Sequence, residues 1–170
     1  DILRNENYLA GSDSRRVEEF NALLTDPDVK AIIAARGGFG CMRLLERLDF
    51  DLIRTHPKIV VGFSDVSVLL NVITSQTGLI TFHGPMTSTL AKTTREDMDS
   101  FIGVLTREIP DALKPTGLEI LRPGNAHGRL VVGNLTSLTH MTATPFEPNL
   151  HNVILVVEDI NEAPYRVDRM

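Results

Sequence analysis

Two short stretches of this sequence place glycines or a serine at the turn where a predicted strand ends and a helix begins. The first is Arg36-Gly37-Gly38-Phe39-Gly40. Glycines at such a turn let backbone N–H groups approach an anion or a developing oxyanion, helped by the partial positive charge of a helix start. The stretch lacks the Lys-Ser/Thr of a P-loop, and Arg43 stands where a dinucleotide fingerprint has its third glycine. Nucleotide binding is therefore not supported, and a plain tight turn remains the alternative.

The second stretch, Gly62-Phe63-Ser64-Asp65, follows the apolar run 58–61. A serine on a strand-to-helix turn is held at the carboxyl edge of the sheet. There its hydroxyl can reach a carbonyl carbon, and the next N–H can stabilise an oxyanion. Val66 stands where the nucleophile turn of α/β-hydrolases has glycine. Ser64 is therefore a candidate nucleophile, with a simple helix cap as the alternative.

Carboxylates end a third stretch. The apolar run 153–157 leads into Glu158-Asp159, and Glu162 follows shortly after. A carboxylate at the carboxyl end of a strand can orient an imidazole in a Ser-His-Glu arrangement. Such residues are equally common as solvated loop charges, so these residues alone leave both roles open.

The elements around these stretches alternate between strands and helices. Apolar runs predict strands at 31–35, 58–62 and 79–82, the first two buried on both faces. Apolar residues at helical spacing predict one helix that begins at Ser12 or Asp13. Three further helices are predicted at 42–48, 66–72 and 97–105, with turn residues between the segments. Strands and helices that alternate in this way form parallel β-α-β units. We therefore expect an α/β fold with a parallel, flavodoxin-like sheet in its N-terminal domain.

Turn-forming residues mark a border after this unit. Prolines and glycines are dense between 110 and 124, which suits a linker. We expect an N-terminal α/β domain over 1–110, a linker over 111–127, and the first part of a smaller α/β C-terminal domain over 128–170. That part should contain strands at 130–132 and 153–157 and a helix near 135–141. Because the chain opens without Met and stops just after a turn-rich segment, we expect it to be a piece of a longer protein.

Composition excludes several classes of protein. The chain has 170 residues, of which 42% are hydrophobic and 23% charged, as is usual for a folded globular protein. A net charge of -5 without a Lys/Arg run argues against a nucleic-acid partner. Cys41 is the only cysteine, so no internal disulfide or cysteine zinc site is expected, and a reducing compartment fits. No apolar run is long enough to cross a membrane.

Several collinear blocks resemble the signature segments of the LD-carboxypeptidase family and together cover nearly the whole chain. The blocks are Leu9-Ala10-Gly11-Ser12-Asp13, Arg36-Gly37-Gly38-Phe39-Gly40, Pro57-Lys58-Ile59-Val60-Val61-Gly62-Phe63-Ser64-Asp65, Phe82-His83-Gly84-Pro85-Met86, Gly133-Asn134-Leu135 and Glu158-Asp159 through Tyr165-Arg166-Val167-Asp168-Arg169. One such block would be a weak signal, whereas several in the right order are a strong one.

This resemblance implies a cytoplasmic serine peptidase of murein recycling that removes the terminal D-alanine from an L,D-linked tetrapeptide. It implies no metal or cofactor, a murein peptide as substrate, and a homodimer. By position, Ser64 matches the nucleophile, and the N–H groups of Asp65 and of Gly37-Gly38 match the oxyanion hole. Glu158 matches the triad glutamate, with Glu162 as the substitute.

The sequence also departs from the family. The resemblance places the triad histidine further along, outside this chain, and His83 belongs to a block of its own, with a packing or orienting role. We therefore expect this piece to be nearly inactive alone. Smaller departures are Val132 and Ala143, where the family usually has glycine. Two other functions stay open: cleavage of an amide in a peptide-nucleotide antibiotic, as some family members perform for self-immunity, and a non-catalytic ligand-binding module.

Overall fold

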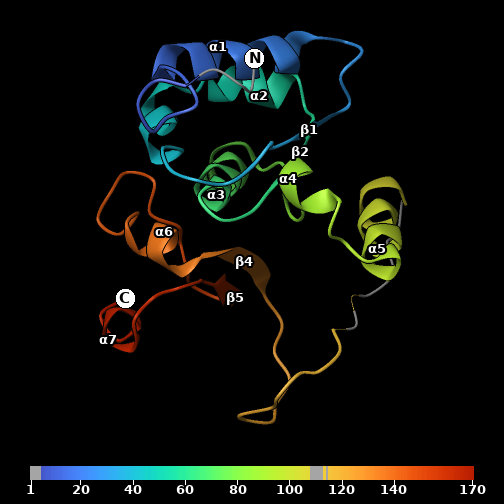
Figure 1. Cartoon of the computed structure of the whole chain (residues 1–170), viewed down its shortest axis with the longest axis vertical. Coiled ribbons are helices and arrows are strands. Elements are labelled where there is room, and N and C mark those ends of the chain that lie inside the picture. The colour runs from blue at the N-terminus through green and yellow to red at the C-terminus, as the bar shows by residue number, and fades with distance from the viewer. Residues whose placement is uncertain (1–4, 108–112, 114) are drawn as a thin grey trace.

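The computed structural model describes residues 5–107, 113 and 115–170, and it contains two parallel sheets (Figure 1). The first has the strand order β1 (Ala31–Ile33), β2 (Ile59–Gly62), β3 (Phe82–His83). The second pairs β4 (Arg129–Asn134) with β5 (Val153–Glu158). The expected α/β fold with parallel strands is confirmed.

Helices connect and cover these strands. They are α1 (Asp13–Thr25), the 3₁₀ helix η1 (Met42–Arg47), α2 (Phe50–Thr55), α3 (Val66–Thr77), α4 (Thr87–Leu90), α5 (Arg95–Thr106), α6 (Leu135–Thr139) and α7 (Pro164–Val167). The hydroxyl of Ser12 caps α1 by accepting a hydrogen bond from the N–H of Arg15 at 3.3 Å. The sequence predicted this helix start.

Helix α3 lies between the two sheets and packs against both of them (Figure 1). Three of its apolar side chains, Val68, Val72 and Ile73, are fully buried. Their burial supplies much of the hydrophobic free energy that holds the N-terminal part together. On its other side, Asn71 donates a hydrogen bond of 2.9 Å to the carbonyl of Val132 in β4. The helix therefore joins the first sheet to the second.

The first sheet differs from expectation at its edge. The run 31–35 was expected to be buried on both faces, but Ala31 is exposed and Ile32 and Ile33 are only partly buried. Two observations explain the difference: β2 is the only strand that pairs with β1 within the described residues, and a cavity of about 740 Å³ lies between α1 and the sheet. Ile32 and Val60 line this cavity. The other predicted strand, β2, is buried as expected.

Some segments also begin or end elsewhere. The strand expected at 79–82 forms only at Phe82–His83, because Ile80 is 75% exposed and does not join the sheet. Helices α2 and α4 were not predicted; each has six residues or fewer, too short for apolar periodicity to show.

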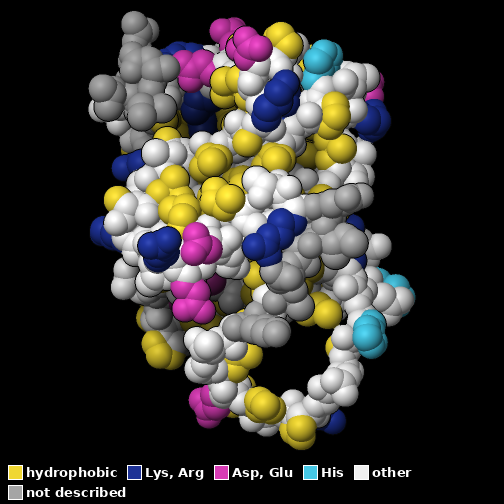
Figure 2. Space-filling view, turned by 90° about the vertical axis from the view of Figure 1, so that its right-hand side faces the viewer, with side chains coloured by type: hydrophobic (Ala, Val, Ile, Leu, Met, Phe, Trp, Pro, Cys, Tyr) yellow, Lys and Arg dark blue, Asp and Glu magenta, His cyan; other side chains and the backbone are white. Residues whose placement is uncertain are grey.

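Residues 115–128 form a long loop before β4. This loop extends away from the rest of the protein at the bottom of both views (Figures 1 and 2). Its apolar side chains are exposed, Leu121 most of all. The domain border predicted at 110–111 lies outside the described residues. None of the helices in the described part of the chain has the length and apolar character needed to cross a bilayer.

Candidate active site

Ser64 lies on the tight turn between β2 and α3. Its φ angle is 60°, in the left-handed region that residues other than glycine rarely adopt. Such a conformation costs on the order of 1–2 kcal/mol and is often found at functional sites. The turn holds the half-buried Ser64 at the carboxyl end of β2, directly before the first turn of α3. This is the strand-turn-helix geometry in which hydrolases present a nucleophile.

Gly62 allows this turn to be tight. A Cβ atom at Gly62 would lie 2.6 Å from Cγ1 of Val66 and 3.3 Å from Cβ of Ala34, so no larger residue fits. Val66 differs from the nucleophile turn of α/β-hydrolases, which has glycine two residues after the serine. In this structure the glycine two residues before the serine provides the close approach of strand and helix.

The glycine loop, defined as residues 36–40, lies against Ser64. A Cβ atom at Gly37 would be 3.0 Å from Oγ of Ser64, so the loop backbone passes directly beside the hydroxyl. The backbone N–H groups of Gly37, Gly38 and Asp65 donate no hydrogen bond to any residue that the structure describes. An oxyanion hole requires unpaired N–H groups near the nucleophilic oxygen, and these residues have unpaired N–H groups on a backbone that passes close to Ser64. The structure brings these four predicted site residues together.

Hydrogen bonds fix the glycine loop at both ends. The N–H groups of Thr87 and Ser88 donate to the carbonyls of Ala34 and Ala35 at 3.1 and 2.9 Å. Beyond the loop, the N–H of Cys41 donates to Oδ2 of Asp65 at 2.9 Å. The carboxylate of Asp65 thus holds the segment that follows the loop, while its own N–H is unpaired among the described residues.

Cys41 is not a competing nucleophile. Burial raises the pKa of its thiol far above the usual value, and the carboxylate of Asp65 raises it further. Because the thiolate is the reactive form, this cysteine is inert at neutral pH. Within the described residues, no three His, Cys, Asp or Glu side chains gather so as to hold a metal ion.

Ser67 connects the nucleophile turn to the second sheet. Its side chain is fully buried, donates a hydrogen bond of 2.7 Å to the carbonyl of Ser64, and accepts one of 3.2 Å from the N–H of Asn134. A Cβ atom at Gly133 would lie 2.9 Å from Oγ of Ser67, so the end of β4 touches this hydroxyl. Sequence reasoning missed Ser67, because its partner is 67 residues away.

Glu158 ends β5, opposite Asn134 in the parallel register. Asn134 also donates a weak hydrogen bond of 3.4 Å to the main-chain carbonyl of Glu158. Oε1 of Glu158 is buried and has no hydrogen-bond donor among the described residues. A buried carboxylate oxygen without a donor is costly, which makes it a candidate for a partner such as an imidazole N–H.

The neighbouring carboxylates are already engaged. Glu162 accepts a hydrogen bond of 3.2 Å from Arg166, one turn later. Asp159 accepts from the hydroxyl of Thr136 at 2.7 Å and from its N–H at 3.0 Å. Burial raises the pKa of Asp159, but these hydrogen bonds outweigh it and leave that pKa below its usual value. Of the three acidic residues, Glu158 alone has a carboxylate oxygen that is buried and unpaired in the described structure.

None of the histidines is hydrogen-bonded to Ser64 or Glu158 in the described part of the chain. His83 pairs with Gly62 in the parallel register of β2 and β3, and the centroid of its ring lies 6.1 Å from that of Phe63. Its Nε2 atom is buried without a partner among the described residues, and burial lowers its pKa. His83 therefore packs beside the turn, where burial favours the neutral form of its ring. Among the residues that the structure describes, Glu158 is linked to Ser64 indirectly, through Asn134 and Ser67.

Both the N-terminal and the C-terminal part of the chain match models of known protein families. Residues 1–84 match the model of the LD-carboxypeptidase N-terminal domain, and residues 127–170 match that of the LD-carboxypeptidase C-terminal domain. A probable murein peptide carboxypeptidase of Bacillus subtilis is 42% identical, over 99% of this chain and 54% of the relative. The chain thus spans about half the length of the curated relatives it matches.

Solved structures agree. The microcin C7 self-immunity protein MccF, in its inactive mutant apo state, superposes with a TM-score of 0.84 at 31% identity, over 98% of this chain and 59% of the other. A muramoyltetrapeptide carboxypeptidase from Oxalobacter formigenes superposes with a TM-score of 0.79 at 34% identity, over 98% of this chain and 56% of the other. MccF has also been solved in complex with aspartyl sulfamoyl adenosine.

Proposed function

The chain belongs to the LD-carboxypeptidase family, and on this basis we propose that it is the nucleophile-bearing part of a serine carboxypeptidase that releases terminal D-alanine from L,D-linked murein tetrapeptide. One observation carries the proposal: Ser64 is held at a φ of 60° with the backbone of Gly37 directly beside its hydroxyl, and the N–H groups of Gly37 and Gly38 are unpaired among the described residues. The similarity to relatives named murein peptide carboxypeptidases supports the substrate class.

In the proposed reaction, Oγ of Ser64 attacks the carbonyl carbon of the L,D-peptide bond while its proton passes to a histidine base. The negative charge that develops on the carbonyl oxygen is accepted by the N–H groups of Asp65 and of Gly37 or Gly38. The C–N bond then breaks, and the histidine returns the proton to the amino group of D-alanine as it leaves. Water, activated by the same base, hydrolyses the acyl-enzyme and frees Ser64.

We assign the triad acid to Glu158, because its buried Oε1 has no donor in the described structure and Glu162 is paired with Arg166. The histidine that Glu158 would orient is proposed to come from the part of the full-length protein outside this chain. The 170-residue piece alone would then be nearly inactive, since loss of a triad member typically costs on the order of 10⁴–10⁶ in turnover. By the same family resemblance, we expect a metal-independent homodimer in the cytoplasm.

The test is D-alanine release from a murein tetrapeptide by the full-length protein, by its Ser64→Ala variant, and by this 170-residue piece. We expect turnover by the full-length protein and a loss of about 10⁴-fold or more in the other two. Full activity of the Ser64→Ala variant, or equal rates for the piece and the full-length protein, would refute the proposal.

Cleavage of a peptide-nucleotide amide is the second candidate, because MccF superposes on this chain with a TM-score of 0.84. The same three proteins are therefore also assayed with aspartyl sulfamoyl adenosine, the ligand of one MccF structure. Preferential cleavage of this compound would favour the second candidate. A non-catalytic module would cleave neither substrate, and a serine-reactive fluorophosphonate would not label Ser64 in the full-length protein.

A further inference from the structure

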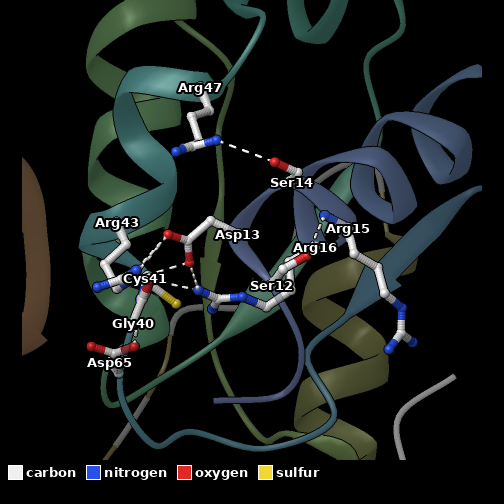
Figure 3. A network of polar contacts seen from close by, with 10 residues as sticks. All are labelled: Ser12, Asp13, Ser14, Arg15, Arg16, Gly40, Cys41, Arg43, Arg47 and Asp65. Carbon is white, nitrogen blue, oxygen red and sulfur yellow. Dashed lines mark hydrogen bonds and ion pairs between the residues drawn. The ribbon is translucent and has the colours of Figure 1, made fainter. Parts of the chain in front are cut away.

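A partly buried ion pair on α1 contacts the end of the glycine loop (Figure 3). Nη2 of Arg16 donates to Oδ1 of Asp13 at 2.7 Å and to the carbonyl of Gly40 at 3.2 Å. The side chains of Arg16 and Asp13 are only 14% and 11% exposed. One guanidinium therefore joins the first turn of α1 to the last residue of the loop.

The backbone conformation of Gly40 and its lack of a side chain allow this contact. Its φ of 116° is one that L side chains rarely adopt, and a Cβ atom there would lie 3.2 Å from both Nη1 and Nη2 of Arg16. The guanidinium thus lies directly against the loop backbone. A larger residue at position 40 would strain the backbone and displace the arginine.

Asp13 holds Arg16 in this position. Its carboxylate also accepts from Nε of Arg43 at 3.1 Å and from Nη2 of Arg43 at 2.8 Å. The hydrogen bonds from Arg43 and then Arg16 lower the pKa of Asp13 to about 2, so the carboxylate is charged at any pH near neutral. Charge-assisted hydrogen bonds of this kind are short and directional, and they restrict the rotamers of both partners.

The loop is thereby fixed between two helices next to the nucleophile. Arg16 of α1 holds the carbonyl of residue 40, and Asp65 before α3 holds the N–H of residue 41. A few residues upstream, Gly37 lies against Ser64. Any rotation of the loop around residue 40 would move the N–H groups of residues 37 and 38 relative to the serine hydroxyl.

We propose that Asp13 and Arg16 are positioning residues for the oxyanion hole, acting through the carbonyl of Gly40. This inference rests on the proposed function, because it assigns the N–H groups of the loop to the oxyanion. Oxyanion contacts form in the transition state and not with the bound substrate. Loss of the Arg16 contact should therefore lower kcat and leave KM nearly unchanged.

Arg43 provides a matched control. Arg43→Met removes a partner of Asp13, as Arg16→Met does, but the side chain of Arg43 makes no hydrogen bond to Gly40 in the described structure. The backbone N–H of Arg43, which donates to the carbonyl of Gly40 at 3.2 Å, is kept in any variant at that position. Both variants lose a salt bridge, and only one loses the side-chain contact to the loop.

The experiment measures kcat and KM for D-alanine release by full-length Arg16→Met, Arg16→Lys, Asp13→Asn and Arg43→Met proteins, together with their unfolding midpoints. Misplacement of an oxyanion donor should lower kcat about 10- to 100-fold in Arg16→Met. We expect a smaller decrease in Asp13→Asn and Arg16→Lys, and less than about 3-fold in Arg43→Met. If Arg16→Met does not fold, Arg16→Lys decides, with at least about a 5-fold decrease in kcat expected.

A second measurement separates this inference from the proposed function. The rate at which a fluorophosphonate labels Ser64 depends on the nucleophile and the oxyanion hole but not on recognition of the peptide. If the wild-type protein is labelled but does not cleave the tetrapeptide, the substrate assignment fails and the labelling rates of the variants still test the positioning role. Equal kcat or labelling losses in Arg16→Met and Arg43→Met, a change confined to KM, or an unlabelled wild-type protein would overturn the inference.

Discussion

The hydroxyl of Ser67 donates a hydrogen bond of 2.7 Å to the carbonyl oxygen of Ser64. The same hydroxyl accepts from the N–H of Asn134, at the end of β4. One buried side chain therefore joins the turn that carries the candidate nucleophile to the strand beside Glu158. The relative placement of the two halves of the site depends on it.

Ser67→Ala should lower the free energy of unfolding of the full-length protein by about 1–3 kcal/mol, because it leaves the partly buried N–H of Asn134 without its acceptor. Urea denaturation measures this change. Ser75→Ala is the control, since Ser75 lies on the same helix and, within the described part of the chain, its hydroxyl bonds only the carbonyl of Val72 one turn earlier. A Ser67→Ala effect no larger than that of Ser75→Ala would contradict the linking role.

Ser64→Gly should be more stable than Ser64→Ala by about 1 kcal/mol, since glycine adopts the left-handed region without the steric cost that alanine carries. Both variants lack the hydroxyl and should be inactive. Their difference in unfolding free energy therefore reports the backbone strain at a φ of 60°, less the larger entropy that glycine loses on folding. If Ser64→Ala proves as stable as Ser64→Gly, the turn does not store this strain.

The position of Ser64 could be predicted from the sequence because the signals there are local. A buried apolar run, a glycine and a serine before a helical segment define a strand-to-helix turn. The same reasoning gave α1 and β5 with bounds close to those observed. It did not give the φ of Ser64 or the contact between Gly37 and its hydroxyl, because these depend on how separate segments pack.

Long-range polar partners were the part that sequence could not supply. The contact of Arg16 with Gly40 spans 24 residues, and no local pattern distinguishes Arg16 from Arg15, whose Nη2 pairs with Glu19 at the surface of the same helix. The choice between Glu158 and Glu162 was also open. Sequence places both near the end of β5, and only the structure distinguishes a buried unpaired oxygen from an existing ion pair.

Gly37→Ala should lower kcat about 10- to 100-fold with a stability change of about 1 kcal/mol. The φ angle of Gly37 lies outside the left-handed region, so the methyl group acts by contact: it would lie 3.0 Å from Oγ of Ser64. Steady-state kinetics of the full-length protein measures the effect. Gly124→Ala is the control because nothing lies within 4 Å of its added Cβ. Unchanged kcat in Gly37→Ala would show that the loop does not constrain the hydroxyl.

His83 should make stability depend on pH. Burial lowers its pKa in the folded protein below the unfolded value of about 6.5. Above pH 6.5, His83 is neutral in both the folded and the unfolded protein, and its burial causes no loss of stability. As the pH falls below about 6.5, the unfolded state binds the proton first, so the free energy of unfolding decreases. Unfolding free energies measured from pH 7.5 to 5.0 should therefore fall less steeply in His83→Gln than in the wild type.

The exposed His151 provides the comparison for this slope. His151→Gln alters a histidine outside the core and should leave the pH dependence close to that of the wild type. The same slope in wild type and His83→Gln would mean that the ring of His83 is solvated in the folded state, against its buried Nε2.

Glu158→Gln should lower kcat about 10³- to 10⁴-fold, because an amide cannot stabilise the imidazolium that forms when Ser64 gives up its proton. Glu162→Gln changes a neighbouring glutamate in the same way, but it removes an ion pair with Arg166, whose side chain is 60% exposed. We therefore expect kcat of this variant to stay within about 3-fold of the wild-type value. D-alanine release by the two full-length variants measures the difference. Because each substitution replaces a carboxylate with a carboxamide of nearly the same size, folding should be disturbed little in either variant. A large loss in Glu162→Gln with little in Glu158→Gln would transfer the triad role to Glu162. The buried, unpaired oxygen of Glu158 would then need another explanation.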